Sequence, residues 1–233
     1  ALFCRFSRGA LGLVVSPPDP SFDNLTLLAT SIFKVPVALV SIVEFEKDRQ
    51  YFKSQQGLPE PWATRRQTPL SHSFCQHVVE QNDALVVDDA RQHRLVCNNG
   101  AVRDLNVIAY LGVPIHDPSN RPVGALCVID GAPRSWRTSE VATLKQLAIC
   151  VNDAIGLRAA VKTSEALRSE QETFTYAISH DLKAPTNTLQ LLLEELSEVL
   201  GSEIDEDALE LLQLGGRTIE RMGRQVEEVL AYT

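Results

Sequence analysis

In the first half of the chain, the apolar positions fall into short runs that are bounded by turn-forming residues. The runs Val37–Val43, Val107–Ile115 and Val123–Ile129 are rich in β-branched side chains and free of charge, which predicts buried strands. The last two runs are joined by residues 116–122, where Asp, Pro, Ser and Asn favour a hairpin connection. The shorter runs Tyr51–Ser54 and Ala84–Val87 predict two further strands.

Helices are expected on both sides of these strands. Residues 1–20 end in the segment SPPDP, which no regular element accommodates, and the next helix is predicted from Phe22 to Phe33. Residues 73–80 also have helical spacing, and the spacing is helical from Thr138 almost to the end of the chain. Strands flanked by helices, with an adjacent hairpin, predict an α+β fold in which helices cover an antiparallel sheet.

The long helical region begins with a narrow apolar stripe. Its members recur about every 3.5 residues, which predicts a parallel coiled coil. Between Val161 and Phe174 polar residues dilute the stripe, and a break in heptad phase locally changes the winding of a supercoil. We therefore expect a rotation or bend to be transmitted through this segment. The stripe consists of Leu144, Leu147, Val151, Ala154, Ile155 and Val161.

A second apolar stripe follows, with steps of three and four residues that are typical of a helix with one buried face. At about 100° per residue, His180 falls opposite this stripe, on a face that also carries Lys183, Ala184 and Asn187. The imidazole is therefore expected to face solvent or a partner. The stripe consists of Phe174, Ile178, Leu182, Pro185, Leu189, Leu192 and Leu196.

The residues next to His180 change its interpretation. A single surface histidine on a helix usually has no function, but Asp181 follows directly, and a carboxylate beside an imidazole fixes a tautomer and stabilises positive charge. Pro185 lacks an N–H, and its ring clashes with the carbonyl of Asp181, so the helix is expected to bend there. The bend would form a hinge beside the histidine.

A second long helix is predicted after a break. Gly201 and Ser202 suit the end of the first helix, and Glu203–Asp207 places acids at the favourable end of the second. Gly215 and Gly216 lower helix propensity by roughly 2 kcal/mol relative to two alanines, and either close packing or a soft point would explain them. Because two antiparallel helices do not bury their apolar faces alone, two chains are expected to form a four-helix bundle.

Composition excludes several partners. The 233 residues include 22 Lys+Arg and 30 Asp+Glu, and the net charge of −8 argues against nucleic acid or an anionic membrane. No apolar stretch approaches the roughly 18 residues that span a bilayer. The five dispersed cysteines lack a CxxC pair, which indicates reduced thiols in a cytoplasmic protein.

One group of histidines and a cysteine has the composition of a metal site but not the spacing. His72, Cys75 and His77 lie within six positions, but His77 would not share a helical face with the other two, and no fourth metal ligand is near. A metal site is therefore not expected. Cys127 and Cys150 stand in apolar runs and are expected to be small buried hydrophobic residues, while Asp88-Asp89 is expected to end a strand.

Residues 21–157 contain several motifs in a defined order. They are RQYFKS at 49–54, SHSFC at 71–75, VDDA at 87–90, LGVPI at 111–115, GALCVID at 124–130 and Pro133-Arg134. Together these motifs resemble those of the GAF sensory domains. The resemblance implies a six-stranded antiparallel sheet with a small-molecule pocket on one face, without naming the ligand. GAF domains that attach a bilin have Cys followed directly by His, whereas Gln76 follows Cys75 here, so a covalent chromophore is not expected.

The second helical region resembles the dimerisation and histidine-phosphotransfer domain of sensor histidine kinases. Phe174, residues 179–185 (SHDLKAP) and Asn187 are similar to its H-box, and Arg221-Met222 with residues 229–232 (VLAY) to its second helix. The resemblance implies that His180 accepts phosphate from ATP, with Asp181 assisting, and passes it to an aspartate of a response-regulator receiver domain. Lys183, Ala184 and Asn187 would dock the regulator. ATP and Mg²⁺ are expected on a separate ATP-binding domain, and no cofactor is expected in this chain.

These interpretations predict an irregular leader at 1–20, a GAF domain at 21–157, a coiled-coil linker at 158–173 and a phosphotransfer domain at 174–233. The predicted function is the sensor part of a two-component histidine kinase, acting as a homodimer. Two alternatives stay open. One is a phosphorelay protein that accepts phosphate from another kinase, and the other is a dimeric GAF ligand-binding module whose histidine is vestigial.

Overall fold

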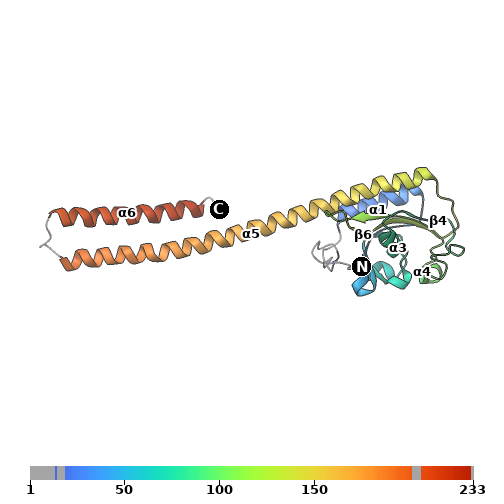
Figure 1. Ribbon diagram of the computed structural model, residues 1–233, viewed down its shortest axis with the longest axis horizontal. Helices are drawn as coiled ribbons and strands as arrows, with labels where there is room; N and C mark the ends of the chain where they lie inside the picture. Colours follow the sequence, from blue (N-terminus) through green and yellow to red (C-terminus); the bar gives the residue numbers. More distant parts are fainter. Residues whose placement is uncertain (1–13, 15–18, 201–205, 232–233) are drawn as a thin grey trace. The chain divides into compact units, whose positions relative to one another are not determined.

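The computed structural model describes residues 14, 19–200 and 206–231, and within its last two helices it leaves several side chains undescribed, those of residues 179–182 and 184–186 among them. The chain divides into two compact units, residues 1–161 and 162–233. The first unit contains a sheet with helices on both faces (Figure 1). The second consists of two long helical segments.

The first unit is built on a six-stranded sheet with the order β3-β2-β1-β6-β5-β4, in which every neighbouring pair is antiparallel. The predicted antiparallel sheet with helices on its faces is therefore confirmed. The hairpin predicted at 116–122 joins the neighbouring strands β5 and β6. The strands are β1 (Val37–Glu44), β2 (Arg49–Gln56), β3 (Gln67–Pro69), β4 (Leu85–Val87), β5 (Ala109–His116) and β6 (Pro122–Asp130).

Short helices and turns complete this unit. The helix predicted from Phe22 begins two residues earlier, because Pro20 is tolerated in a first turn and the carboxylate of Asp19 accepts the Ser21 N–H at 2.9 Å. The helix predicted at 73–80 is observed as α3, which begins two residues later and ends one residue later, and a 3₁₀ turn precedes it. The elements are α1 (Pro20–Phe33), η2 (Phe45–Lys47), α2 (Trp62–Arg65), η3 (Leu70–His72), α3 (Cys75–Gln81) and α4 (Gly100–Asp104).

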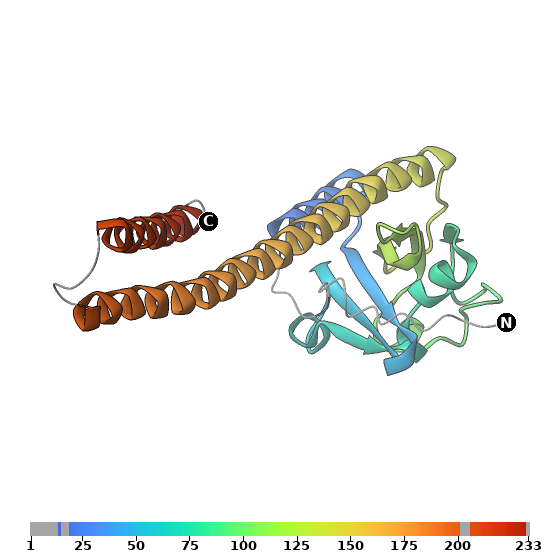
Figure 2. The same cartoon turned by 60° about the vertical axis from the view of Figure 1, so that its left-hand side comes forward.

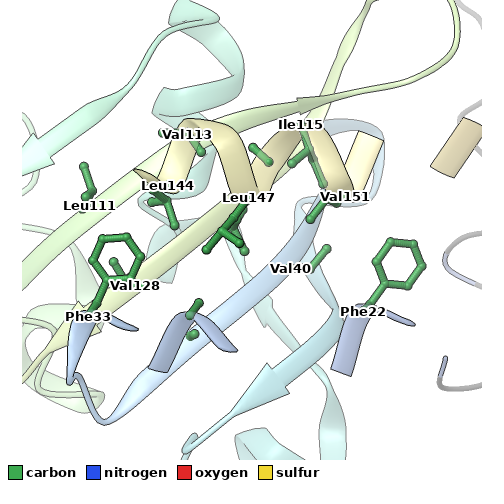
Figure 3. Packing of buried hydrophobic residues seen from close by; sticks show 14 of the residues in the cluster. Phe22, Phe33, Val40, Leu111, Val113, Ile115, Val128, Leu144, Leu147 and Val151 are labelled. Atoms are coloured by element: carbon green, nitrogen blue, oxygen red, sulfur yellow. The ribbon is translucent and has the colours of Figure 1, made fainter. Parts of the chain in front are cut away.

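Alternation along β6 explains why the sheet is covered on both faces. Leu126 and Val128 point into a core shared with α1, whereas Cys127 and Ile129 point into a second core shared with α3. A strand that is buried on both faces has apolar residues at every position, which is the pattern seen in the sequence. Figure 3 shows the first core, where side chains from α1, the sheet and the following long helix meet.

The first core corrects one prediction. Helix α5 (Thr138–Leu200) contributes Leu144, Leu147, Val151 and Ile155 to this core, and each is at most 9% exposed (Figures 2 and 3). The coiled coil predicted for these positions is therefore wrong, because their apolar stripe packs on the sheet of the same chain. The spacing alone did not distinguish a sheet from a second helix as the partner.

The start of α5 is fixed by the residues that precede it. The guanidinium of Arg134 donates to the Phe33 carbonyl at 2.8 Å, and the indole of Trp136 donates to the Val87 carbonyl at 3.1 Å. Asp88 follows β4 directly, and its carboxylate accepts a hydrogen bond from the backbone N–H of Trp136 at 3.1 Å. The prediction that Asp88-Asp89 ends a strand is confirmed, and these bonds hold the first turns of α5 to the sheet.

In the second unit, residues 162–200 of α5 are followed by α6 (Glu206–Ala231). Gly201 follows the last residue of α5, as predicted, although residues 201–205 lie outside the described part of the chain. A Cβ on Gly215 would lie 3.3 Å from Leu193 Cδ1, whereas one on Gly216 would meet nothing within 4 Å. Close packing therefore explains Gly215, and the two helices form a hairpin (Figure 1). A four-helix bundle needs a second chain and stays a prediction.

Candidate functional site

The second core encloses a small pocket between the sheet and helices α3 and α4. Its cavity has a volume of about 40 Å³. One molecule occupies about 30 Å³ in liquid water, so the cavity is larger than one water molecule and smaller than two. Most of its wall is apolar or aromatic, with a few polar groups from β2, η3, α3, β5 and β6. It is lined by Val37, Leu39, Gln50, Phe52, Leu58, Pro59, His72, Phe74, Cys75, Ala101, Leu105, Val107, Tyr110, Cys127 and Ile129.

Two cysteines and a tyrosine form a buried cluster in this wall. Cys75 opens α3, Cys127 lies in the middle of β6, and their Sγ atoms are 3.8 Å apart. The Tyr110 hydroxyl lies 3.3 Å from Cys75 Sγ, and all three side chains are at most 2% exposed. The Phe74 ring packs against Tyr110 with centroids 5.2 Å apart. The three polar atoms therefore share one site, shielded from bulk water.

The surroundings separate the acidities of the three groups. The hydrogen bond between the Cys75 and Cys127 side chains lowers the pKa of Cys75 against the opposing effect of burial, and Ser41 and Tyr110 also lower it. Burial raises the pKa of Cys127 well above its ordinary value, as does the neighbouring Cys75 sulfur. Burial likewise raises the pKa of Tyr110. The cluster therefore lowers the pKa of Cys75 and raises that of Cys127, and the Tyr110 hydroxyl is placed to donate to Cys75 Sγ.

A glycine makes room for the tyrosine in this cluster. Gly112 stands two positions after Tyr110 on β5, and the two therefore face the same side of the sheet. A Cβ on Gly112 would lie 2.2 Å from the Tyr110 hydroxyl oxygen, a distance that atoms do not tolerate. The absent side chain lets the phenol lie along the strand with its hydroxyl at Cys75.

His72 forms another part of the wall. Its Nε2 lies 2.8 Å from an Asp104 carboxylate oxygen of α4, and its ring lies 5.9 Å from the Trp62 ring of α2. A Cβ on Gly100 would lie 2.6 Å from the imidazole, so the first residue of α4 leaves the space that the ring occupies. His72 therefore links three short elements on one side of the pocket.

Hydrogen bonds hold the segment between η3 and α3 in place. The Gln76 amide donates to the carbonyls of Leu70 and Ser73, each at 2.8 Å, and the Ser73 hydroxyl donates to the Gln50 side chain of β2. The Asn99 amide also donates to the Ser73 carbonyl at 3.2 Å. The position that would be histidine in a bilin-attaching motif is thus occupied here by a side chain that fixes the backbone.

The cluster His72, Cys75 and His77 is only partly brought together. His72 and Cys75 line the pocket, whereas His77 Nδ1 lies 3.3 Å from a Glu80 carboxylate oxygen on α3. Among the described residues, no group of three or more His, Cys, Asp or Glu side chains is placed to hold a metal ion. Cys150 corrects a prediction, because it is exposed on α5, whereas Cys127 is buried as predicted.

The second predicted site lies on the hairpin. His180 and Pro185 are residues of α5, and this helix continues without interruption past the proline. The side chains of His180, Asp181, Ala184 and Pro185 lie outside the described part. Lys183 and Asn187 are exposed, as predicted. Within one chain the predicted apolar stripe is exposed too: Phe174 by 65%, Ile178 by 40%, Leu189 by 46%, Leu192 by 54% and Leu196 by 48%.

Sequence reasoning missed the residues that complete the pocket. The sequence pattern places Tyr110 and Cys127 in apolar strands without indicating a site, and it gives Asp104 no role. One signal was available, since residues two apart on a strand share a face, and Tyr110 followed by Gly112 marks a large side chain beside an empty position. The distance between Cys75 and Cys127, 52 positions apart in sequence, had no such signal.

In the described part of the chain, no helix is both long and apolar enough to cross a bilayer.

Similar proteins support the assignment of the first unit. Residues 17–155 match the GAF domain family. A cyclic di-GMP phosphodiesterase from Pseudomonas aeruginosa is 34% identical over 125 residues, which are 53% of this chain and 20% of that protein. The matched part therefore spans about a fifth of the length of this relative.

Solved structures share the fold at low sequence identity. Free methionine-R-sulfoxide reductase from Neisseria meningitidis, in complex with its substrate, gives a TM-score of 0.50 at 16% identity, over 70% of this chain and 98% of that one. A domain assigned to a two-component sensor histidine kinase from Sinorhizobium meliloti 1021 gives 0.49 at 13% identity, over 63% and 94%. The family match covers more than half of the chain and coincides with the six-stranded sheet, so the chain belongs to the GAF domain family and its first unit is a GAF sensory domain.

Proposed function

We propose that this chain is a ligand-sensing module in which a small molecule enters the GAF pocket and displaces part of its wall. The observation that carries the proposal is the pocket itself, an apolar hollow with a few converging polar groups, which is the usual form of a small-molecule site. The family assignment and the sensory role of GAF domains support it.

The size of the cavity defines how sensing would work. Sites for drug-sized ligands enclose roughly 300–1,000 Å³, so the cavity of about 40 Å³ corresponds to a closed state. Any ligand larger than a few atoms has to move the wall, and it stabilises the open form by as much as its affinity for the two forms differs. The segment from Leu58 to Trp62 and helix α4 are the short elements most easily displaced.

Helix α5 supplies a route for such a change. Its first turns pack on the sheet opposite the pocket, and the same helix continues into the hairpin. A shift of the sheet would therefore act on a continuous helix. We do not transfer the hydrolytic activity of the phosphodiesterase, because the similarity reaches only about a fifth of that protein.

The pocket is tested by filling it. The purified chain and an Ala101→Phe variant would be incubated with a small-molecule extract of cells, freed of unbound material and analysed by mass spectrometry. Ala101 is 2% exposed and lines the cavity, so a phenyl ring there occupies the ligand space. A matched variant, Ala160→Phe, adds the same ring at an exposed position of α5.

We expect a compound that the native chain and the Ala160→Phe variant retain and the Ala101→Phe variant loses. An absorption spectrum of the same purified chain shows whether haem or bilin is bound. A compound retained equally by all three proteins, or no retained compound at all, would contradict ligand sensing by this pocket.

A second function, histidine phosphotransfer at His180, is favoured by a separate observation. Residues 174–187 carry the H-box-like sequence, and they lie on the first helix of a helical hairpin. The exposed apolar stripe of that helix is what a bundle formed by two chains would cover. In this role His180 receives phosphate from ATP held by a separate domain, and Asp181 orients the ring.

Radioactive phosphate transfer tests this role. The chain would be mixed with a histidine-kinase ATP-binding domain and labelled ATP, beside a His180→Gln variant and a matched His77→Gln variant. We expect alkali-stable label in the native chain and the His77→Gln variant only. Equal labelling of the His180→Gln variant, or an unlabelled native chain with a domain that labels its own partner, supports the vestigial alternative.

The homodimer is tested by light scattering. If hairpins of two chains pack through the stripe, the molar mass at micromolar concentration is that of two chains. A monomer at that concentration would remove the basis for the bundle.

A further inference from the structure

Two thiols of the pocket wall stand close enough to react with each other. Cys75 and Cys127 come from different elements, α3 and β6, and their Sγ atoms are separated by 3.8 Å. Both line the cavity, so a molecule inside it meets both sulfur atoms. Of the other described cysteines, Cys97 is partly exposed and Cys150 is exposed, and neither lines this pocket.

We propose that Cys75 and Cys127 are a peroxide-sensitive dithiol that closes into a disulfide when hydrogen peroxide enters the cavity. This inference goes beyond ligand sensing, because it assigns a covalent, reversible modification to the pocket and needs no other ligand. Hydrogen peroxide is the oxidant, and a cellular thiol would reduce the disulfide again.

The chemistry proceeds in two balanced steps. The Cys75 thiolate attacks one peroxide oxygen, the O–O bond breaks, and the departing hydroxide takes a proton to leave as water, which gives a sulfenic acid on Cys75. The Cys127 sulfur then attacks the Cys75 sulfur and loses its proton, and the sulfenic hydroxyl leaves as a second water. Two thiols and one peroxide become one disulfide and two waters.

The site assigns a different role to each cysteine. The Tyr110 hydroxyl lies 3.3 Å from Cys75 Sγ and can donate to a thiolate there, and the hydrogen bonds of Cys75 with Cys127, Ser41 and Tyr110 lower its pKa. Thiolate character decides which sulfur is oxidised. Cys127 keeps its proton because burial opposes the charge. Cys75 is therefore the attacking sulfur, and Cys127 resolves the sulfenic acid.

The cavity selects the oxidant by size. A volume of about 40 Å³ admits a molecule not much larger than water, and hydrogen peroxide meets that limit. Bulky oxidised disulfides such as oxidised glutathione do not enter it in the closed state. The same sulfurs that are buried from larger reagents are thus open to peroxide.

The required movement is small. A disulfide has its sulfurs about 2.05 Å apart, so Cys75 and Cys127 have to approach by about 1.7 Å, which side-chain rotation beside a cavity can supply. The bond would tie the first turn of α3 to the centre of β6. It would thereby fix one wall of the pocket in its closed form.

The test uses a chain in which the other cysteines are removed, Cys4→Ser, Cys97→Ser and Cys150→Ser together. The reduced protein is treated with hydrogen peroxide, unfolded in denaturant so that the buried thiols become accessible, blocked with N-ethylmaleimide and analysed by intact mass and peptide mapping. We expect both thiols to be lost for each peroxide consumed, a peptide that links Cys75 to Cys127, and full recovery of the thiols with dithiothreitol. Circular dichroism before and after treatment shows that the fold persists.

Two variants separate the roles. Cys127→Ser should stop the reaction at a sulfenic acid on Cys75, which dimedone traps when the treated protein is unfolded in its presence. Tyr110→Phe should slow the oxidation of Cys75 by about fivefold to tenfold, the rate ratio that one lost hydrogen bond of about 1 kcal/mol corresponds to. Tyr51→Phe is the matched control. This substitution also removes a tyrosine hydroxyl, but Tyr51 does not line the pocket, so the rate of Cys75 oxidation should stay unchanged.

The proposal is overturned if both thiols still react with maleimide after peroxide treatment that oxidises Cys150 in the unsubstituted chain. It is also overturned if Cys127→Ser yields no sulfenic acid on Cys75. These measurements involve no extract or ligand, and the extract experiment involves no oxidant. A failure of the dithiol proposal can therefore be distinguished from a failure of the ligand-sensing proposal.

Discussion

Helix α5 carries two similar apolar stripes that lie in opposite environments. In its first part, Leu144 and Val151 are fully buried against the sheet. In its later part, Leu189 is 46% and Leu192 is 54% exposed within the single chain. Both stretches are helical and amphipathic, so spacing alone does not separate them.

The difference follows from what each stretch packs against. The sheet offers a broad apolar face, and covering that face removes both surfaces from water at about 25 cal/mol per Å². The hairpin offers one other helix, and of its described residues only Ile219 is counted among the buried apolar side chains. The GAF unit is therefore stable through contacts within the chain, whereas the hairpin depends on additional contacts, which we propose come from a second copy.

The largest effect is expected for Leu144→Ala compared with Leu192→Ala. Leu144 is 0% exposed, and truncation of a leucine in a packed core typically lowers the free energy of unfolding by about 3 to 5 kcal/mol. Leu192→Ala should change the unfolding of the GAF unit by less than about 0.5 kcal/mol and weaken dimers instead. Denaturant titrations at several protein concentrations measure both effects. A concentration-independent loss of equal size in the two variants would show that the hairpin has a core of its own.

Pro185→Ala should affect only the hairpin. A proline inside a helix costs about 3 kcal/mol relative to alanine, since it removes an N–H and clashes with the preceding turn. The variant should stabilise the second unit by up to that amount and leave the GAF unit unchanged. Amide hydrogen exchange reports the two units separately. Unchanged exchange near residue 185 would mean that the helix already accommodates the proline, and with it the proposed hinge would lose its basis.

Lys53 gives the GAF unit a pH dependence that we do not expect of the hairpin. Its side chain is 1% exposed, the Phe22 ring lies 6.0 Å from its Nζ, and burial lowers its pKa to about 8 from 10.5, with Arg158 acting in the same direction. Between these two values the unfolded chain binds more protons at this group than the folded chain does. Stability therefore rises with pH across this window.

We expect this rise to be about 2 kcal/mol between pH 7 and pH 10, after allowance for solvent screening, and to be absent in Lys53→Met. The free energy of unfolding of the native chain and of Lys53→Met would be measured at each pH over that range. Subtracting one profile from the other removes the contributions of the other titrating groups. Parallel pH profiles for the two proteins would show that Lys53 keeps its ordinary pKa in the fold.

The smallest effect is expected at the paired glycines of α6. Gly216→Ala should stabilise the hairpin by about 1 kcal/mol through helix propensity, because a Cβ there meets nothing within 4 Å. Gly215→Ala should gain less, since its Cβ would crowd Leu193. Thermal unfolding of the second unit compares them. If Gly216→Ala instead breaks a dimer, the second copy packs against that glycine.

Much of the fold was predictable because local patterns carried it. The β-branched runs predicted β1, β5 and β6, and the turn residues 117–121 predicted their hairpin. The three-residue strand β3 and the short helices α2 and α4 were missed, since elements of three to five residues contain too little periodicity to be detected. The predicted coiled coil at Leu144–Ile155 failed because two possible partners produce the same spacing.

The site was predictable only in part. Cys75 and His72 were singled out from a local motif, and the pocket was implied by the resemblance to GAF domains. Their partners Cys127, Tyr110 and Asp104 lie 32 to 52 positions away in the sequence, and nothing local links them. The H-box-like segment is the reverse case, since its chemistry was read from adjacent residues.

The sequence by itself determined the strands, the long helices, the GAF motifs and the residues of the H-box-like segment, because each depends on neighbours a few positions apart. Only the tertiary structure decided that the first stripe of α5 packs on the sheet and that two distant thiols meet in a cavity. Those outcomes depend on which apolar surfaces cover one another, and that free energy is set by contacts between elements rather than by the order of residues within them.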